Sequence, residues 1–206
     1  MIRAIANAIM FRRARQLANR LLPLLPESGL IADVGSGTGH NAEVLRRQSA
    51  CKLVQFDVAD MHWVGEPPER ITDDPQTLSF AGRKIDCVLL IYVLQYPDDP
   101  ALLLNRIFSE GAKQILVVQS TYRNRWGKYM FRIQEALFGP LAFYLARLLR
   151  LIAQGKCSVK PIRYLQASDV VELLNRIDVR ICDHQSDSNW LLGTGTDLFV
   201  CRKEIR

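Results

Sequence analysis

A glycine-rich turn between an apolar run and a helical segment constrains the fold of this chain most. Residues 30–34 (LIADV) form the apolar run, and residues 35–39 (GSGTG) follow it directly. Three glycines in five positions tolerate positive φ angles and let a ligand approach the backbone. Residues 41–48 have a helical composition, so the first amide groups of that helix would point at the ligand. In an open α/β sheet such a junction is the expected ligand crevice.

The remaining chain alternates apolar runs with helical segments. The 206 residues, 49% of them hydrophobic, are enough for a single domain, 1–206, with a filled core. Further strands are predicted at residues 52–57, 85–91, 114–118, 179–183 and 197–202. Helices are predicted over residues 1–26, 100–108 and 168–176, the last with Ser168 as its N-cap. This alternation predicts an α/β fold, an open doubly wound and mostly parallel sheet with helices on both faces.

The spacing of the glycines decides between two kinds of ligand. A dinucleotide-binding fingerprint requires glycine at the first, third and sixth positions, but the sixth position here is His40. In addition, Asp33 lies two residues before the first glycine. A carboxylate there would repel a pyrophosphate and would attract a ligand with a cationic amine. The pattern therefore disfavours a dehydrogenase.

An acid followed by three alternating glycines resembles motif I of the class I S-adenosylmethionine-dependent methyltransferases. The resemblance implies a seven-stranded sheet whose last two strands form an antiparallel pair. It also implies that the glycine loop wraps the methionine portion of the cofactor and that Asp33 lies near its amino-acid end.

Three further segments resemble this family in the expected order. Asp57, at the end of the second strand, matches the acid that binds both ribose hydroxyls, and Met61 would then pack on the adenine. Residues 74–80 (DPQTLSF) are similar to the family's D-A-x-x-L-P-F segment, in which Asp74, or else its neighbour Asp73, would bind the adenine amine. Residues 85–94 are similar to the fourth strand, which ends beside the methyl group. The cofactor-binding residues that the resemblance implies are Asp33, Gly35, Ser36, Gly37, Gly39, Asp57, Val58, Met61, Asp73, Asp74 and Tyr92.

The chain departs from the family pattern after Asp57. Gly65, Pro67 and Pro68 disfavour a long helix there, so the helix expected after the second strand is shortened or lost. The usual L-K-P-G-G turn before the fifth strand is also replaced, by residues 108–113 (FSEGAK). Both departures concern local loop geometry and leave the cofactor site in place.

The sequence contains three candidates for a catalytic base, which oxygen or nitrogen acceptors can require. They are Tyr92, Tyr96 and His184. Each also has a structural interpretation: Tyr96 closes a turn before Pro97, and His184 flanks a strand. No metal-ligand cluster is expected.

The residues at the end of the fourth strand disfavour two classes of acceptor. Residues 91–94 (IYVL) lack the N/D-P-P-Y/F motif of enzymes that methylate planar amino groups, and they lack an acid for a catechol-type metal site. Methylation of nucleobase amines and metal-assisted catechol chemistry are therefore disfavoured.

Charge is distributed unevenly along the chain. The net charge is +6, yet residues 1–26 hold five arginines and no acid, and residues 123–163 hold nine basic residues and one acid. The rest of the chain therefore carries −7. The opening helix also contains apolar residues that we predict to lie near one face, namely Ile2, Ile5, Ile9, Leu17 and Leu21.

Residues 122–163 form an insertion after the fifth strand, where we predict two helices broken at residues 139–140. They contain more apolar side chains than one packing face would use: Trp126, Met130, Phe131, Phe138, Phe143, Tyr144, Leu148 and Leu151. These residues either cover the sheet edge or form a lid over a hydrophobic acceptor. With arginines beside them, they and the opening helix form basic amphipathic surfaces that suit an anionic membrane.

The favoured hypothesis is methyl transfer from S-adenosylmethionine to a small, hydrophobic or lipid-like acceptor. Two alternatives remain: a methyltransferase that contacts RNA or protein through its basic flanks, and a non-catalytic cofactor-binding module. We expect a cytoplasmic protein, peripheral to a membrane at most. No apolar segment reaches the roughly 18 residues of a membrane span, and the five cysteines lack the spacing of a disulfide framework.

Overall fold

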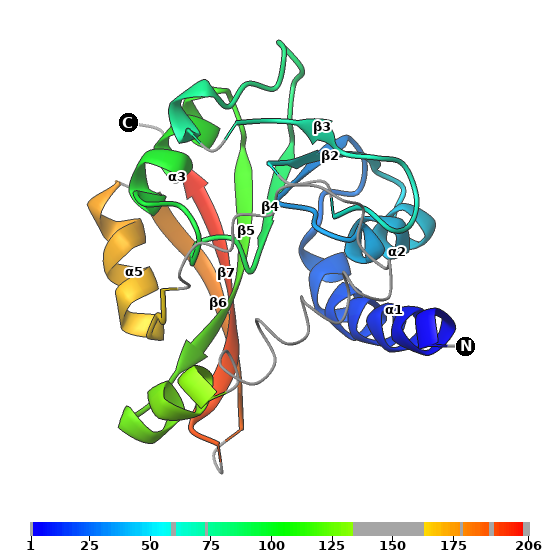
Figure 1. Cartoon of the computed structure of the whole chain (residues 1–206). Coiled ribbons are helices and arrows are strands. Elements are labelled where there is room, and N and C mark those ends of the chain that lie inside the picture. The colour runs from blue at the N-terminus through cyan, green and yellow to red at the C-terminus, as the bar shows by residue number, and fades with distance from the viewer. Residues whose placement is uncertain are drawn as a thin grey trace.

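The protein is described by a computed structural model that covers residues 2–58, 61–72, 74–133, 163–177, 179–189 and 192–203. A seven-stranded sheet with the order β3-β2-β1-β4-β5-β7-β6 forms its centre (Figure 1). The strands are β1 (Leu30–Val34), β2 (Lys52–Asp57), β3 (Glu69–Arg70), β4 (Cys87–Ile91), β5 (Gln114–Tyr122), β6 (Val179–Asn189) and β7 (Thr194–Lys203). Strands β1 to β5 pair in parallel, whereas β7 pairs antiparallel with both β5 and β6. The predicted doubly wound, mostly parallel fold is confirmed.

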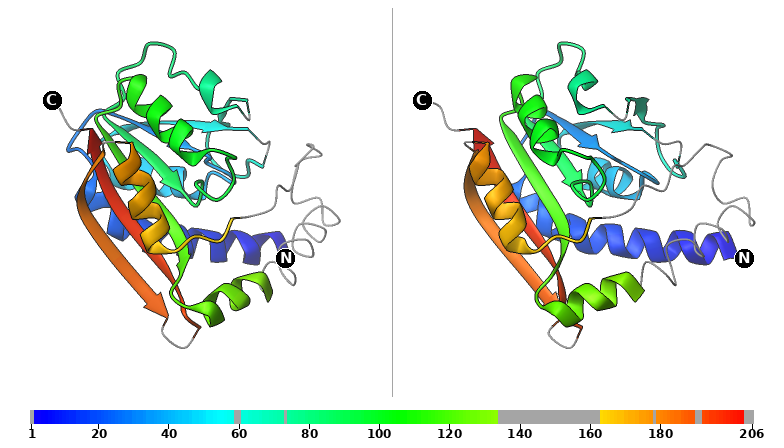
Figure 2. Two further views of the ribbon diagram at one scale, coloured as in Figure 1. Left: turned by 90° about the vertical axis from the view of Figure 1, so that its left-hand side faces the viewer. Right: turned by 60° about the vertical axis from the view of Figure 1, so that its left-hand side comes forward.

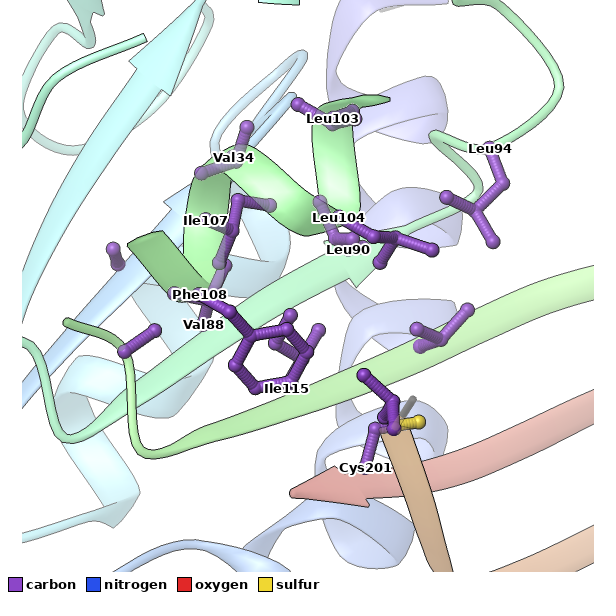
Figure 3. Packing of buried hydrophobic residues seen from close by; sticks show 14 of the residues in the cluster. Val34, Val88, Leu90, Leu94, Leu103, Leu104, Ile107, Phe108, Ile115 and Cys201 are labelled. Atoms are coloured by element: carbon purple, nitrogen blue, oxygen red, sulfur yellow. The ribbon is translucent and has the colours of Figure 1, made fainter. Parts of the chain in front are cut away.

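Helices cover both faces of the sheet (Figures 1 and 2). The helices are α1 (Ile2–Leu21), α2 (His40–Gln48), α3 (Pro100–Ser109) and α5 (Ala167–Arg176), with short 3-10 helices η1 (Leu22–Leu24) and η2 (Pro75–Thr77). Side chains of α1 and α2 form one hydrophobic cluster with the sheet, and those of α3 form another with the opposite face. In Figure 3, Leu104 and Phe108 of α3 lie over Leu90 and Ile115.

Coverage on both faces explains why the central strands were recognised from sequence. All five residues of β4 are buried, and four of the five in β1 are buried. A strand between two helical layers has no solvent face, so it is a continuous apolar run rather than an alternating pattern. The strand before the glycine turn therefore lies between two hydrophobic clusters, one on each face of the sheet.

The antiparallel strands are longer than predicted. Strand β4 ends at Ile91, which pairs with Val118, but β5 continues to Tyr122 and pairs there with Thr194. Strand β6 likewise continues to Asn189. The β5–β7–β6 unit thus projects beyond the edge of the sheet at which the parallel strands end, here called the carboxyl edge.

Two local predictions were wrong. Helix α5 begins at Ala167 and has Gln166 as its N-cap, so Ser168 is already inside the helix. The Asp169 carboxylate accepts the Gln166 backbone N–H at 2.7 Å and stabilises this earlier start. In α1, Leu17 and Leu21 are buried, but Ile5 and Ile9 are more than half exposed, so these residues do not share one face.

The insertion is described only in part. Residues 125–133 are helical, as predicted, whereas the second predicted helix and Phe138, Phe143, Tyr144, Leu148 and Leu151 lie outside the described residues. After β2, the described residues 61–68 contain no helix. The prediction that the helix after the second strand is shortened or lost is confirmed for this part of the chain. No helix among the described residues is long and apolar enough to cross a membrane.

Candidate active site

The glycine loop connects β1 to α2 at the carboxyl edge. Gly35, Gly37 and Gly39 have φ angles of 78°, 56° and 82°, a region that side chains other than glycine rarely adopt. A Cβ on Gly35 would lie 2.6 Å from Val93 Cγ2, and one on Gly39 would lie 2.4 Å from the Val64 carbonyl oxygen. A Cβ on Gly37 would meet nothing within 4 Å. The outer glycines are therefore required by packing, and the middle one faces open space in which a ligand can lie.

Two carboxylates lie beneath this loop at the ends of neighbouring strands. The Asp57 side chain at the end of β2 accepts the Gly37 backbone N–H at 2.6 Å, which fixes the loop. Asp33 in β1 is only 1% exposed, and its two carboxylate oxygens have no hydrogen-bond partner in the described structure. Burial, assisted by the negative charge of Asp57, raises the pKa of Asp33 to about 7.

These unsatisfied groups fit the amino-acid end of S-adenosylmethionine. A buried carboxylate without partners is costly, and a cationic ammonium with several N–H donors compensates for that cost directly. The Ser36 hydroxyl is also buried without a partner among the described residues. Asp33, Ser36 and the open side of Gly37 thus form a cradle for a positively charged, hydrogen-bonding group.

The residues expected to face the adenosine portion lie around the loop after β2. Its Trp63 and Val64 backbone N–H groups donate to the Thr38 carbonyl oxygen at 3.1 and 3.3 Å, so it packs against the glycine loop. Met61 in the same segment is half-buried, and Val58 is exposed. These contacts hold the loop that contains Met61 against the glycine loop, and the roles of Met61 and Val58 toward the cofactor stay predictions.

The assignment of the adenine-binding acid stays a prediction. Asp74 is exposed and caps η2, because its carboxylate accepts the Gln76 N–H at 2.9 Å. Asp73 lies outside the described residues. One oxygen of Asp74 is therefore already used locally, and the other is the one that the adenine amine would have to reach.

A hydrogen-bonded chain from α1 to the glycine loop was not found from sequence. His40 Nε2 lies 2.7 Å from the Asn7 amide oxygen, and its Nδ1 lies 2.8 Å from the Thr38 hydroxyl. With the amide assigned in this way, Nε2 donates to Asn7 and Nδ1 accepts from Thr38, which requires a neutral ring. Burial, followed by the nearby His62, lowers the pKa of His40 and favours that neutral form. No sequence pattern connects a residue of the first helix to a residue 33 positions later.

Rings pack around this histidine. The Phe11 ring of α1 lies 4.8 Å from His40 and the Trp63 ring lies 5.8 Å from it, both edge to face. His40 is the first residue of α2 and is buried there. Because α1 and the loop after β2 both contact it, His40 connects the two segments that flank the glycine loop.

Tyr92 follows β4 at the carboxyl edge, and β4 is the neighbour of β1, the strand before the glycine loop. Its φ angle of 59° is strained for a tyrosine, and its backbone N–H donates to the Val118 carbonyl oxygen at 2.7 Å. Tyr96 closes a turn by donating its N–H to the Val93 carbonyl oxygen at 3.0 Å. Both side chains are exposed. The structure thus places the two tyrosines on one loop beside the glycine turn.

His184 lies elsewhere, on β6 at the edge of the sheet, and β5 and β7 separate it from β4. Its Nε2 lies 2.8 Å from an Asp197 oxygen, and its ring stacks on Phe199 at 4.3 Å. Asp197 is fully buried and also accepts hydrogen bonds from Thr121 and Arg123. Burial alone would raise the pKa of Asp197, but these three donors lower it. The arrangement ties the β5–β7–β6 unit together, and it does not bring His184 to the two tyrosines.

A buried polar side chain on β5, near the loop that contains the two tyrosines, was also not predicted from the sequence. Gln119, one residue beyond the partner of Tyr92 on β5, is fully buried, and its amide nitrogen donates to the Gln95 side-chain oxygen at 3.1 Å. The Gln119 amide oxygen has no partner in the described structure. Native proteins leave few buried acceptors without a partner, so this oxygen is a candidate contact for an N–H or O–H group of a bound ligand. No group of three potential metal-ligating side chains occurs among the described residues.

A sheet of this order, a glycine loop after β1 and acids at the ends of β1 and β2 together define a class I S-adenosylmethionine-dependent methyltransferase. A family model described as a methyltransferase domain matches residues 6–181, and the chain belongs to that family. The cofactor is S-adenosylmethionine, and structural relatives have been crystallised with it or with S-adenosylhomocysteine. No protein with a curated description matches the sequence.

Several solved structures are similar in fold at low sequence identity. A putative methyltransferase of Haloferax volcanii, in complex with the Trm112 methyltransferase activator, has a TM-score of 0.66 at 14% identity and covers 97% of this chain and 94% of its own. Geranyl diphosphate C-methyltransferase from Streptomyces coelicolor has a TM-score of 0.62 at 9% identity, with 92% and 79% covered. Magnesium protoporphyrin IX methyltransferase from Synechocystis with bound S-adenosylhomocysteine has a TM-score of 0.56 at 14% identity, with 94% and 83% covered.

Proposed function

We propose that this methyltransferase acts on a small hydrophobic or lipid-like acceptor bound at the carboxyl edge beside Tyr92. One observation carries the proposal. Among the described residues, the large hydrophobic side chains that are exposed are Ile5, Ile9, Val58, Tyr92, Tyr96, Trp126 and Tyr129. Each belongs to a segment at the carboxyl edge: the amino-terminal half of α1, the loops after β2 and β4, or the helix after β5. A soluble domain rarely leaves such side chains exposed together unless they meet a ligand or partner.

Within this proposal the chain holds the reactants and excludes water. When bound, the cofactor supplies a methyl group already activated on a sulfonium, so alignment and desolvation are the main tasks of the protein. Asp33 binds the ammonium, Asp57 binds the ribose and Gly37 leaves room between them. Tyr92 and Tyr96 provide aromatic surface for the acceptor, and Gln119 accepts a hydrogen bond from its polar group.

The comparison structures support an acceptor of this kind without defining it. The similar enzyme from Streptomyces coelicolor was crystallised with geranyl diphosphate, a hydrophobic chain with a polar end. A hydrophobic acceptor is most concentrated at or in a bilayer, so the proposal includes a peripheral location at a membrane surface.

A macromolecular acceptor is the second candidate. Arg12, Arg13, Arg125 and Arg132 are exposed and form no ion pair with another described residue, so they are available for phosphates. An RNA methyltransferase would be retained on RNA with a steep dependence on salt. An enzyme for a small hydrophobic acceptor would not show that retention.

The test uses cofactor with a labelled methyl group and a cell extract as the source of acceptors. We expect the label to enter the organic phase and not the fraction that acid precipitates. Gly37→Arg and Asp57→Ala should abolish cofactor binding in calorimetry and remove the label, while circular dichroism shows an intact fold. Label recovered in RNA or protein would refute the acceptor class, and wild-type cofactor affinity in either variant would refute the site.

A further inference from the structure

Helix α1 exposes a strip of mixed character on its outer face. Ile5, Ile9, Arg12 and Arg13 recur at positions i, i+4, i+7 and i+8, so they lie on one side of the helix. All four are exposed, and more than half of each isoleucine is accessible to solvent. The opposite side of the helix packs on the sheet. The strip is therefore an outward face that the fold of the chain does not use.

The helix after β5 has a second strip of the same kind. Arg125, Trp126, Tyr129 and Arg132 are its exposed residues, at positions i, i+1, i+4 and i+7. The Trp126 and Tyr129 rings lie 5.7 Å apart, and each is 54% exposed. Two aromatic side chains therefore stand between two arginines on one face.

The two strips belong to helices that lie on opposite sides of the sheet (Figure 1) and project in a common direction. Figure 2 shows α1 and the helical residues 125–133 extending away from the sheet in the same direction in both views. The amino-terminal half of α1 reaches the glycine loop, because Asn7 contacts His40. Residues 125–133 follow β5, whose end projects beyond the carboxyl edge. We call the two strips together the basic rim: Ile5, Ile9, Arg12, Arg13, Arg125, Trp126, Tyr129 and Arg132.

The charge of the basic rim is uncompensated. Residues 1–26 and 123–133 contain no acid, and the four arginines of the rim form no ion pair with another described residue. Uncompensated arginines next to exposed apolar side chains attract a partner that is negatively charged at its surface and apolar beneath it. An anionic bilayer has this layered chemistry.

We propose that the basic rim is a docking surface for a membrane that contains anionic lipids. The arginines contact lipid phosphates, Trp126 and Tyr129 lie at the headgroup level, and Ile5 and Ile9 enter the acyl boundary. RNA would also use the arginines and the aromatic rings, but the two aliphatic side chains gain nothing from phosphates or bases. Their presence in the same strip favours lipid.

Docking by this surface has a consequence for the reaction. The carboxyl edge, with the glycine loop and Tyr92, would then face the lipid headgroups, and an acceptor could pass from the bilayer to the site without crossing water. This inference extends the proposed peripheral location. Lipid binding is measured without acceptor or cofactor, so the docking surface and the proposed reaction can fail independently.

The experiment measures partitioning of the full chain onto vesicles of pure phosphatidylcholine and of an equimolar mixture with phosphatidylglycerol. We expect binding to the anionic vesicles only. Each arginine near an anionic surface contributes about a fivefold change in partitioning, so Arg12→Gln with Arg13→Gln should weaken binding about thirtyfold. The matched control is Arg180→Gln with Lys203→Gln, which removes the same charge from exposed residues at the opposite end of the sheet and should leave binding nearly unchanged.

A second pair of variants separates lipid from RNA. Ile5→Gln with Ile9→Gln should weaken vesicle binding severalfold and leave the retention of the protein on RNA unaltered. Because both positions are exposed, the melting temperature should not fall. The proposal is overturned by equal binding to neutral and anionic vesicles, by no vesicle binding, or by vesicle binding that neither pair of variants reduces. Salt-dependent RNA retention without vesicle binding would assign the surface to RNA instead.

Discussion

Asp33 should destabilise the protein when no cofactor is bound, and Asp33→Asn should remove that cost. The carboxylate is buried and lacks partners, and its pKa of about 7 exceeds the ordinary value of 3.8. A carboxyl group whose pKa rises on folding binds more protons in the folded than in the unfolded state between these two pH values. Its presence therefore lowers the free energy of unfolding progressively from about pH 4 to pH 7, and fully above pH 7.

The size of the effect follows from the same pKa values. A change from 3.8 to about 7 corresponds to up to about 4 kcal/mol of lost stability at pH 8. Asp33→Asn keeps the shape of the side chain and removes its charge, so the variant should be more stable than the wild type at pH 8 and nearly equal to it at pH 4. For a domain of this size, 1 kcal/mol shifts the melting temperature by about 2–4 °C, so a gain of at least about 5 °C is expected at pH 8.

Ionisation of Asp33, which lowers the stability of the free protein, should raise its affinity for the cofactor. The ammonium of S-adenosylmethionine binds the ionised form of Asp33, and about a tenth of the carboxyl groups are ionised at pH 6 against about nine tenths at pH 8. Affinity measured by calorimetry should therefore be about tenfold weaker at pH 6. The Asp33→Asn variant should bind weakly with no such dependence. It is the control for the titration of the cofactor's own amine, because any pH dependence that remains in the variant cannot come from Asp33. A wild-type affinity that is equal at both pH values, or a variant that melts below the wild type at pH 8, would refute this account of Asp33.

Three further substitutions test other parts of the site. Gly37→Val should cost about 2 kcal/mol of stability, from the strain of a β-branched residue at positive φ and not from a clash, because a Cβ there meets no atom within 4 Å. Calorimetry should nevertheless detect no cofactor binding. Asn7→Ala removes the hydrogen bond to His40 and should weaken cofactor affinity about fivefold in the same assay, whereas Asn19→Ala, on an exposed turn of the same helix, should not. Tyr92→Gly should raise the melting temperature by relieving strain at φ 59° and should lower turnover; unchanged turnover would exclude Tyr92 from the acceptor site.

The parts of the fold predicted well are those in which one physical constraint dominates the sequence. Strand β4 is buried on both faces and has to be apolar throughout, so its position is evident from residues 87–91 alone. The glycine loop needs positive φ at three alternate positions, so its glycines mark the end of β1 and the start of α2. Of the predicted cofactor-binding residues, the structure brings Asp33, Gly37 and Asp57 together, and their contact with the cofactor stays a prediction.

Predictions failed where a specific side-chain or strand-pairing contact, local or between distant segments, decides the outcome. Residues 183–189 are mostly polar and exposed, and they are a strand because their backbone pairs with β7. Ser168 has a better intrinsic preference for an N-cap than Gln166, but the Asp169 carboxylate shifts the helix start by binding the Gln166 N–H. The contacts of His40 with α1 connect residues 33 positions apart, and no local pattern encodes such a pairing.

The division of charge along the chain separates two kinds of binding, and salt can distinguish them. Asp33 is buried beneath the glycine loop, where ions in solution screen its interaction with a cationic ligand only weakly. The arginines of the basic rim are exposed, and at physiological salt their attraction to a charged surface decays within about 8 Å. Raising the salt concentration should therefore release the protein from anionic vesicles while leaving its affinity for S-adenosylmethionine nearly constant. A parallel loss of both would mean that one set of charges serves both ligands, and the assignment of the acids to the cofactor and of the arginines to the membrane would then be wrong.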